Sequence, residues 1–245
     1  MTHIEYKRKV RTIGICGGIG SGKTTLCELL RNLKNVEIIN ADSIGHHVLK
    51  EPKTITKLCE LFGEQNITTT NEVKVNESEE LGITKVIDRV KLGNIVFSDK
   101  KKMEQLNQVM WPRIGDEMVS IWKEKTKPSQ TKEEESTLFL FFEAAVLLEA
   151  QWHLQLNIWD ELWVVCADKV KACARILKRN SHLSAEQASA RIDAQMDNEK
   201  RIATAQDKKI SSKVHIEVIW NNFDTIKEFQ DVFNDIIEKM QKRAA

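Results

Sequence analysis

The chain has 245 residues, of which 41% are hydrophobic and 30% are charged, and its formal net charge is +1. This length suits one α/β domain, alone or with a smaller insert, and the composition is typical of a globular protein with a full apolar core. A near-neutral charge excludes bulk electrostatic attraction to nucleic acid or to a membrane surface, so any cationic site must be local.

The cysteines and the N-terminal segment together favour a cytoplasmic protein. The cysteines are odd in number and form no CxxC pair, which predicts reduced thiols that mostly pack in the core. Residues 1–12 are basic and precede only a short apolar run, so we expect neither a signal peptide nor a membrane span, and the segment is a poor transit peptide. The five cysteines are Cys16, Cys27, Cys59, Cys166 and Cys173.

The first quarter of the chain alternates strand and helix patterns. Residues 12–16 form a short apolar run that ends in glycine, which predicts a buried strand. Leucines recur on one face of residues 24–33, which predicts a helix. A second strand is expected at 36–39, followed by helical residues 44–62 with a new start at Pro52.

The middle of the chain is less regular in its pattern. Residues 63–84 are polar and are expected to be irregular. Helical apolar spacing returns over residues 86–122, with breaks expected near 97–99 and at Pro112. Residues 123–136 are highly charged and are expected to form a linker or loop.

Three further strands are expected in the second half, at residues 138–142, 162–166 and 214–220. Helices are expected after the second and the third of these strands. Strands that alternate with helices in this way predict a parallel five-stranded sheet covered by helices on both faces.

Capping residues mark the starts of the C-terminal helices. Asp168 can cap the helix after the strand at 162–166. The stretch SAEQ at 184–187 is a capping box that is expected to open a helix through about Asn198. Thr225 and Glu228 form a second capping box, which begins the final helix.

The glycine-rich segment that follows the first strand satisfies the pattern G-x-x-x-x-G-K-[ST]. Glycines allow successive N–H groups to turn inward and cradle phosphate, and the following helix adds its N-terminal donors. Lys23 supplies a charge to the β- and γ-phosphates, and the Thr24 hydroxyl can ligate Mg²⁺. The strand before it and the helix after it favour a nucleoside-triphosphate site over an ordinary glycine-rich turn. The nucleotide contacts are assigned to Gly17, Gly18, Ile19, Gly20, Ser21, Gly22, Lys23, Thr24 and Thr25.

Three carboxylates are candidates for the chemistry beside this loop. Asp42 follows the strand at 36–39, where a carboxylate can orient or deprotonate an acceptor hydroxyl, and its alternative role is a helix cap or turn. Glu143 ends the strand at 138–142 and can act as a Walker-B-like metal ligand. Glu149 is a separate candidate, and both glutamates have a structural role as the alternative.

Arginines in the C-terminal half suggest a lid. Arg175 and Arg179 are four residues apart on one predicted helix, and Arg191 and Gln195 repeat this spacing on the next. Such a helix pair can close over transferring phosphates and exclude water, although a solvated hairpin is the plain alternative. Without an NKxD guanine-reading motif or a long second ATPase core, the pattern favours a small-molecule kinase over a switch GTPase or motor ATPase.

Eight motifs follow one another along the chain: IGICGGIGSGKTTL, INADSIGHHV, IDRVKLGNIVF, LNQVMWPRI, AAVLLEAQW, RILKRN, ARIDAQM and VIWNN. In order and spacing they resemble the dephospho-CoA kinase family, from about residue 12 to 235. A Trp-Pro pair at 111–112 and the segment 144–150 look most like the kinase domain of the eukaryotic bifunctional CoA synthase, since bacterial members more often carry His-Pro and PLL-x-E there.

The resemblance implies a P-loop NTPase fold of the nucleotide-kinase type and ATP-dependent phosphorylation of the ribose 3′-hydroxyl of dephospho-CoA, giving CoA and ADP. It implies one domain over residues 1–245 and ATP with Mg²⁺. The expected parts are a core at about 10–45, 137–178 and 212–243, a helical substrate-binding region at about 46–122, and a lid at about 179–205.

The resemblance also assigns roles to individual residues. Asp42 matches the family's catalytic aspartate, which would orient the 3′-hydroxyl and accept its proton, and Arg89 matches the arginine of the DR-x-x-LG motif, which would bind substrate phosphate or ribose. Catalysis is assigned to Asp42, Lys23, Arg175 and Arg179; substrate binding to Asp42, Arg89, Glu149, Gln195 and Arg201; adenine-side binding to Asn221; and the metal to Thr24 and Glu143.

Four positions depart from the family pattern. Asn40 replaces the first aspartate of D-A-D, and Trp111 replaces the bacterial histidine. Gln206 stands where alanine or aspartate is usual, and Phe223 replaces the glycine of NNG, which can reshape the adenine pocket. Lys23, Thr24 and Asp42 are all kept, so activity is expected.

Two other functions compete with this hypothesis: another P-loop nucleoside or nucleotide kinase, and a non-catalytic nucleotide-binding scaffold subunit. The expected partner is dephospho-CoA as a small-molecule substrate, with no nucleic acid and no membrane. Association with other CoA-biosynthesis enzymes is compatible with the sequence, and we expect a monomer or small homo-oligomer.

Overall fold

The computed structural model describes residues 9–74, 81–128 and 137–244. The chain divides into two compact units, one formed by residues up to Asn40 and from Val119 onward, the other by Ala41–Met118. The second unit covers nearly the same residues as the 46–122 region that the resemblance assigns to substrate binding. That assignment of function remains a prediction.

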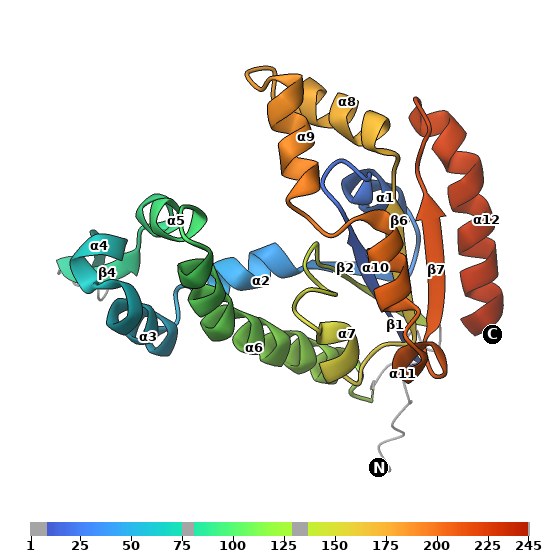
Figure 1. Cartoon of the computed structure of the whole chain (residues 1–245). Helices are drawn as coiled ribbons and strands as arrows, with labels where there is room; N and C mark the ends of the chain where they lie inside the picture. Colours follow the sequence, from blue (N-terminus) through green and yellow to red (C-terminus); the bar gives the residue numbers. More distant parts are fainter. Residues whose placement is uncertain (1–8, 75–80, 129–136, 245) are drawn as a thin grey trace, which may run out of the picture. The chain divides into compact units, whose positions relative to one another are not determined.

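The first unit is built on a parallel sheet, as predicted, with strand order β2-β5-β1-β6-β7 (Figure 1). The central strands are buried on both faces, which explains why their sequences are continuous apolar runs rather than alternating ones. The strands are β1 (Val10–Gly17), β2 (Val36–Asn40), β5 (Leu138–Glu143), β6 (Glu161–Cys166) and β7 (His215–Trp220).

Helices cover this sheet, and Figure 1 shows α12 running alongside β7. One apolar cluster joins α1 and α12 to the strands, and Phe141 of β5 packs edge-on against Trp163 of β6 with ring centroids 5.3 Å apart. The helices are α1 (Lys23–Leu30), α7 (Trp152–Gln155), α8 (Lys169–Arg179), α9 (Ala185–Asp193), α10 (Asn198–Ala205), α11 (Lys208–Ser211) and α12 (Ile226–Ala244).

Strand register brings three strand ends to one edge of the sheet. Glu143 at the end of β5 pairs in register with Ile15 of β1 and with Asn40 of β2. The loop after β1 therefore starts at the same edge as Asn40 and Glu143, which is where ligands bind in open α/β sheets.

The second unit contains a small antiparallel pair of strands, β3 (Thr68–Lys74) and β4 (Leu81–Ile87). Its helices are α2 (Ala41–Val48), α3 (Pro52–Phe62), α4 (Glu64–Ile67), α5 (Arg89–Phe97) and α6, which runs from Lys100 to Lys125, past the boundary of the unit. Asp88 caps α5 by accepting hydrogen bonds from Val90 N and Lys91 N at 2.9 and 3.0 Å.

Two predictions in this unit are wrong. Residues 63–84 are not irregular, because α4 and the two strands occupy the described part of this range; residues 75–80 lie outside it. The β-branched residues here favour strands despite the polar composition. Pro112 does not end a helix but lies inside α6, since a proline removes a single backbone donor and the helix continues on both sides. The break near 97–99 is confirmed.

Other boundaries need correction. The first helix ends at Leu30 rather than at 33, and α6 extends to Lys125, into the predicted 123–136 linker, of which 129–136 lie outside the described residues. Asp168 occupies the cap position of α8, but its side chain accepts no hydrogen bond from that helix.

The capping boxes at Ser184 and at Thr225 are confirmed. However, the helix that Ser184 opens ends at Asp193, not near Asn198, because Asp197 accepts a hydrogen bond from Lys200 N at 2.7 Å and starts a new helix, α10. This break sets Gln195 in a short connection between two helices.

Among the described residues, no helix is long and apolar enough to cross a membrane.

Candidate active site

The loop between β1 and α1 has the backbone that a phosphate cradle requires. Gly20 has φ 75° and Gly22 has φ 98°, a region that side chains disfavour, and Gly22 is the N-cap residue of α1. The Asn221 side chain lies directly against the position that a Cβ on Gly22 would take. Both the conformation and the lack of space therefore require glycine at position 22.

We expect Gly22→Ala to weaken ATP binding at least tenfold and to lower stability by about 1–3 kcal/mol, because the new methyl group meets Asn221 in a strained backbone. Isothermal titration with ATP and a thermal melt would measure both effects. Gly45→Ala is the matched control: its methyl group would meet Ile114 at an ordinary 3.4 Å. Wild-type ATP affinity in Gly22→Ala would show that the loop geometry is not needed.

Lys23 folds back over the loop. Its Nζ donates hydrogen bonds to Gly17 O at 2.8 Å and to Gly18 O at 3.0 Å. Burial lowers the pKa of this ammonium group, and the nearby Glu143 carboxylate opposes that shift. The loop thus carries a positive charge in a largely desolvated place, where it interacts strongly with an anion.

A second cation lies beside the loop, contributed by α10. Arg201 is only 2% exposed, and its guanidinium group lies near Gly18. Its ion pair with Glu149 is long, at 3.9 Å, and within the described residues its Nε has no hydrogen-bond partner. A buried guanidinium group that is incompletely paired has strong binding capacity for phosphate.

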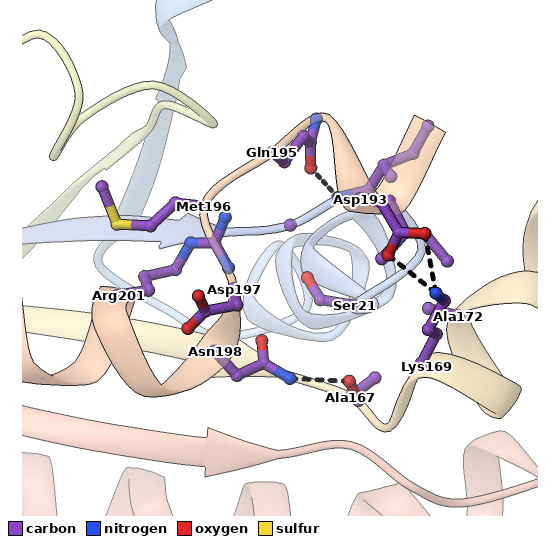
Figure 2. Close-up of a pocket in the computed structure, with 13 residues that line it drawn as sticks. Ser21, Ala167, Lys169, Ala172, Asp193, Gln195, Met196, Asp197, Asn198 and Arg201 are labelled. Carbon is purple, nitrogen blue, oxygen red and sulfur yellow. Dashed lines mark hydrogen bonds and ion pairs between the residues drawn. The ribbon is translucent and has the colours of Figure 1, made fainter. Parts of the chain in front are cut away.

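Arg201 and the loop border a cavity of about 260 Å³ (Figure 2). Gln195 reaches the loop here, and its Oε1 accepts a hydrogen bond from Ile19 N at 2.7 Å. The Ser21 side chain is buried beside them, and its hydroxyl has no hydrogen-bond partner in the described chain. Polar groups from α10, from the 194–197 connection and from the loop therefore converge on one cavity.

Arg175 braces the loop from the other side. It donates to Gly20 O at 3.1 Å, to Asn221 O and Oδ1 at 2.9 and 3.0 Å, and to Phe223 O at 2.9 Å. Burial and, to a smaller extent, neighbouring Arg179 lower its pKa. These contacts connect the loop to the end of β7, which is a positioning task; its predicted contact with transferring phosphate remains a prediction.

A second cavity, of about 420 Å³, opens beside Arg175. Gly22, Thr25, Arg179, Asn221 and Phe223 are among the residues that border it. An aromatic ring next to phosphate-binding groups suits a purine base followed by its phosphates. Phe223, which departs from the family pattern, also packs on Phe229 with ring centroids 6.1 Å apart.

Glu143 accepts a hydrogen bond from Asn40, the residue that departs from the family's D-A-D motif. Asn40 Nδ2 donates to Glu143 Oε2 at 2.5 Å, between the ends of adjacent strands. Asn40 thus engages one of the two carboxylate oxygens of Glu143. Thr24 lies in the first turn of α1. The oxygen donors of Thr24 and Glu143 fit Mg²⁺, which usually takes one or two protein ligands plus waters and substrate phosphates.

In the first unit the structure brings Asn221 and three residues predicted to bind the substrate, Glu149, Gln195 and Arg201, close to the phosphate loop or to one another. The predicted substrate-binding role of those three residues stays a prediction. Asp42 and Arg89 belong to the second unit. Asp42 lies in the first turn of α2 and is exposed. Arg89 is the first residue of α5 and borders a groove of about 780 Å³, together with His46, Lys50, Ile55 and Val86 among others.

Three residues near the loop, Lys169, Asp193 and Asn198, were not predicted from the sequence. Lys169 binds both carboxylate oxygens of Asp193 at 2.7 and 2.8 Å, and Asn198 Nδ2 donates to Ala167 O at 2.9 Å (Figure 2). The sequence offered one signal, for Asn198 alone: Asp197 is a typical helix-capping residue, and a helix that starts there places Asn198 in its first turn.

Comparison with known proteins shows the family to which this chain belongs. The family model for dephospho-CoA kinase matches residues 11–213. The chain belongs to the dephospho-CoA kinase family. The family likeness predicted from sequence is thereby confirmed; the specific likeness to the eukaryotic bifunctional enzyme remains a prediction.

Relatives within the family span nearly the whole chain. The dephospho-CoA kinase of Dehalococcoides mccartyi is 34% identical over 80% of this chain and 86% of its own length. That of Carboxydothermus hydrogenoformans is 28% identical over 93% of each chain. The solved dephospho-CoA kinase from Campylobacter jejuni superposes with a TM-score of 0.60 at 22% identity, covering 96% of this chain and 100% of that one, which confirms the fold.

Proposed function

We propose that this protein transfers the γ-phosphoryl group of ATP to the ribose 3′-hydroxyl of dephospho-CoA, giving CoA and ADP. The observation that carries the proposal is the family match over residues 11–213 in a chain whose phosphate loop, Lys23 and Arg201 are assembled around one site. In the reaction the bond from the γ-phosphorus to the bridging oxygen of ATP breaks, and the acceptor oxygen takes its place.

On the nucleotide side, Lys23 and the loop amides neutralise the charge that develops on the transferring phosphoryl group. Arg201 and Arg179 supply further positive charge, and Arg175 holds the loop against the strand end that borders the base cavity. Thr24 and Glu143 would hold Mg²⁺, which supplies charge neutralisation on the phosphates when bound.

On the acceptor side, Asp42 orients the 3′-hydroxyl and accepts its proton. Arg89 binds the diphosphate of dephospho-CoA. The groove beside Arg89 supports this role, since His46 and Lys50 add nitrogen donors while Ile55 and Val86 offer apolar walls for an uncharged chain.

The test is ADP release by purified protein with Mg-ATP and a single acceptor. Rapid turnover is expected with dephospho-CoA and not with AMP or uridine. Turnover with AMP or uridine alone would contradict the proposal and favour another nucleotide kinase. No turnover with any acceptor, together with normal ATP binding, would favour the scaffold function.

We expect Asp42→Asn to lower kcat by about 10²–10⁴-fold, because the amide cannot accept the hydroxyl proton. ATP affinity should stay near the wild-type value, since the substitution changes no residue of the phosphate loop. Steady-state kinetics and ATP titration separate the two quantities. Asp99→Asn, at the start of α6, is a control with the same chemical change. An Asp42→Asn enzyme with wild-type kcat would remove Asp42 from the mechanism.

We also propose a cytoplasmic location. Five free cysteines, three of them buried, support a reducing compartment. Burial raises the pKa of Cys16, just before the phosphate loop, to about 12, so this thiol is a packing residue and not a nucleophile.

A further inference from the structure

The contact between Gln195 and the phosphate loop has a consequence for nucleotide binding. Ile19 N donates to Gln195 Oε1 at 2.7 Å, across 176 positions of the chain (Figure 2). Gln195 belongs neither to α9, which ends at Asp193, nor to α10, which begins at Asn198. A side chain on a short connection between lid helices thus satisfies a backbone donor of the loop.

The connection is fixed at both ends. At one end Asp193 accepts two hydrogen bonds from Lys169, near the start of α8. At the other, Asn198 donates to Ala167 O, in the turn before α8. Gln195, between these anchors, is therefore directed at Ile19 by contacts that are independent of the loop itself.

The Ile19 amide can serve one strong acceptor at a time. Loop amides of this kind donate to phosphate oxygens, and a side-chain carbonyl oxygen at 2.7 Å occupies the position that a phosphate oxygen would need. Gln195 bound to Ile19 and phosphate bound to Ile19 are therefore alternative arrangements.

We propose that Gln195 takes the place of a phosphate oxygen at Ile19 N–H, and that the nucleotide's phosphates displace it. Nucleotide binding and the position of the 194–197 connection are then coupled, and the coupling is reciprocal. The inference takes one point from the proposed function, namely that the bound nucleotide is an adenine nucleotide.

The chemistry of the side chain suits displacement. The amide oxygen of Gln195 is neutral, whereas a phosphate oxygen is charged and forms hydrogen bonds roughly twice as strong with N–H donors. Arg201, whose guanidinium group lies with Gln195 Oε1 near Gly18, favours the anion further. Gln195 can therefore accept a hydrogen bond from the Ile19 amide when no phosphate is bound, and phosphate can displace it.

Gln195→Ala is the test, with ADP and inorganic pyrophosphate as probes. Removing the competing acceptor is expected to lower the Kd of both ligands about twofold to tenfold, the range of one hydrogen bond. In ¹⁵N–¹H spectra the Ile19 amide of wild type should shift when ADP is added. In Gln195→Ala without nucleotide, the Ile19 amide resonance should already differ from its position in nucleotide-free wild type. Gln195 is exposed, so folding should be kept; Gln195→Ser repeats the test with a different replacement.

Gln187→Ala provides the control for general loosening of the lid. It removes the hydrogen bond from Ser184 N to the Gln187 side chain, one half of the capping box of α9, but leaves Gln195 in place, so the Ile19 resonance and the ADP Kd should stay as in wild type. Unchanged or weaker ADP binding in Gln195→Ala, or an Ile19 amide in wild type that ADP does not move, would overturn the proposal. Neither readout uses dephospho-CoA, so failure here is distinguishable from failure of the proposed reaction.

Discussion

Lys23→Met is expected to lower the rate of phosphoryl transfer by at least about 10³-fold, which corresponds to about 4 kcal/mol of transition-state stabilisation. The methionine keeps most of the length of the side chain and loses only the charge. In the structure this charge is partly buried, and burial lowers its pKa. A desolvated charge has a large effect because little solvent screens it.

The measurement is single-turnover ADP formation with dephospho-CoA, with a thermal melt to establish that the variant folds. Lys239→Met is the matched control, because Lys239 is exposed on α12 and pairs only with Asp235, four residues away, among the groups that the structure describes. A Lys23→Met protein that keeps more than a tenth of the wild-type rate would mean that other cations, Arg201 first among them, carry the phosphate charge.

The sequence allowed accurate prediction of features whose cause is local. The phosphate loop is contiguous, so its glycines, Lys23 and Thr24 could be identified together, and the strands β1, β5 and β6 are short, largely apolar runs. Both capping boxes depend on residues three apart. In these cases the residues that determine the structure are also neighbours in the chain.

Features that depend on distant pairing could not be predicted. The β3–β4 pair was missed because β3, TTTNEVK, is mostly polar and lies in a segment expected to be irregular, and because a strand pair is defined by hydrogen bonds between segments that a local pattern does not connect. Arg175 was assigned to phosphate, yet its hydrogen bonds reach Asn221 and Phe223, some 46 and 48 positions away. Gln195 meets Ile19 only because a helix breaks at Asp197. No spacing rule encodes such contacts.

Asn40 shows how a departure from a family pattern can be chemically conservative. An aspartate at this position would place two carboxylates within hydrogen-bond distance, which disfavours ionisation of both. The amide of Asn40 instead donates to Glu143. The departure therefore keeps Glu143 oriented at the edge of the sheet without a second negative charge beside it.

Glu161→Leu is expected to lower the free energy of unfolding by about 3 kcal/mol. Glu161 is fully buried at the start of β6 and accepts hydrogen bonds from Arg243 at 3.1 and 2.8 Å and from Trp163 Nε1 at 3.0 Å, with Arg11 at 3.4 Å. Removing it leaves two arginines without their buried partner. The loss lies at the low end of the 3–5 kcal/mol range because their side chains are 23–25% exposed and partly screened.

Urea denaturation at pH 7 measures this loss, and Glu238→Leu, which removes an exposed pair with Lys242, should cost less than about 1 kcal/mol. If Glu161→Leu lowers the free energy of unfolding no more than Glu238→Leu does, the cluster of Glu161 with Arg11 and Arg243 does not stabilise the packing of β1, β6 and α12 as its geometry indicates.

The same cluster predicts a pH dependence. Burial alone would raise the pKa of Glu161, but the hydrogen bonds from Arg243 and Trp163 outweigh it and lower the pKa below its ordinary value of 4.5. A depressed carboxyl pKa stabilises the fold at pH values above 4.5, and this contribution disappears as the pH falls through the lowered value. The stability difference between wild type and Glu161→Gln should therefore be constant from pH 7 to about pH 5 and shrink toward pH 3. A difference that grows on acidification would mean that Glu161 is bound in its protonated form, and that Arg243 and Arg11 are not its ionic partners.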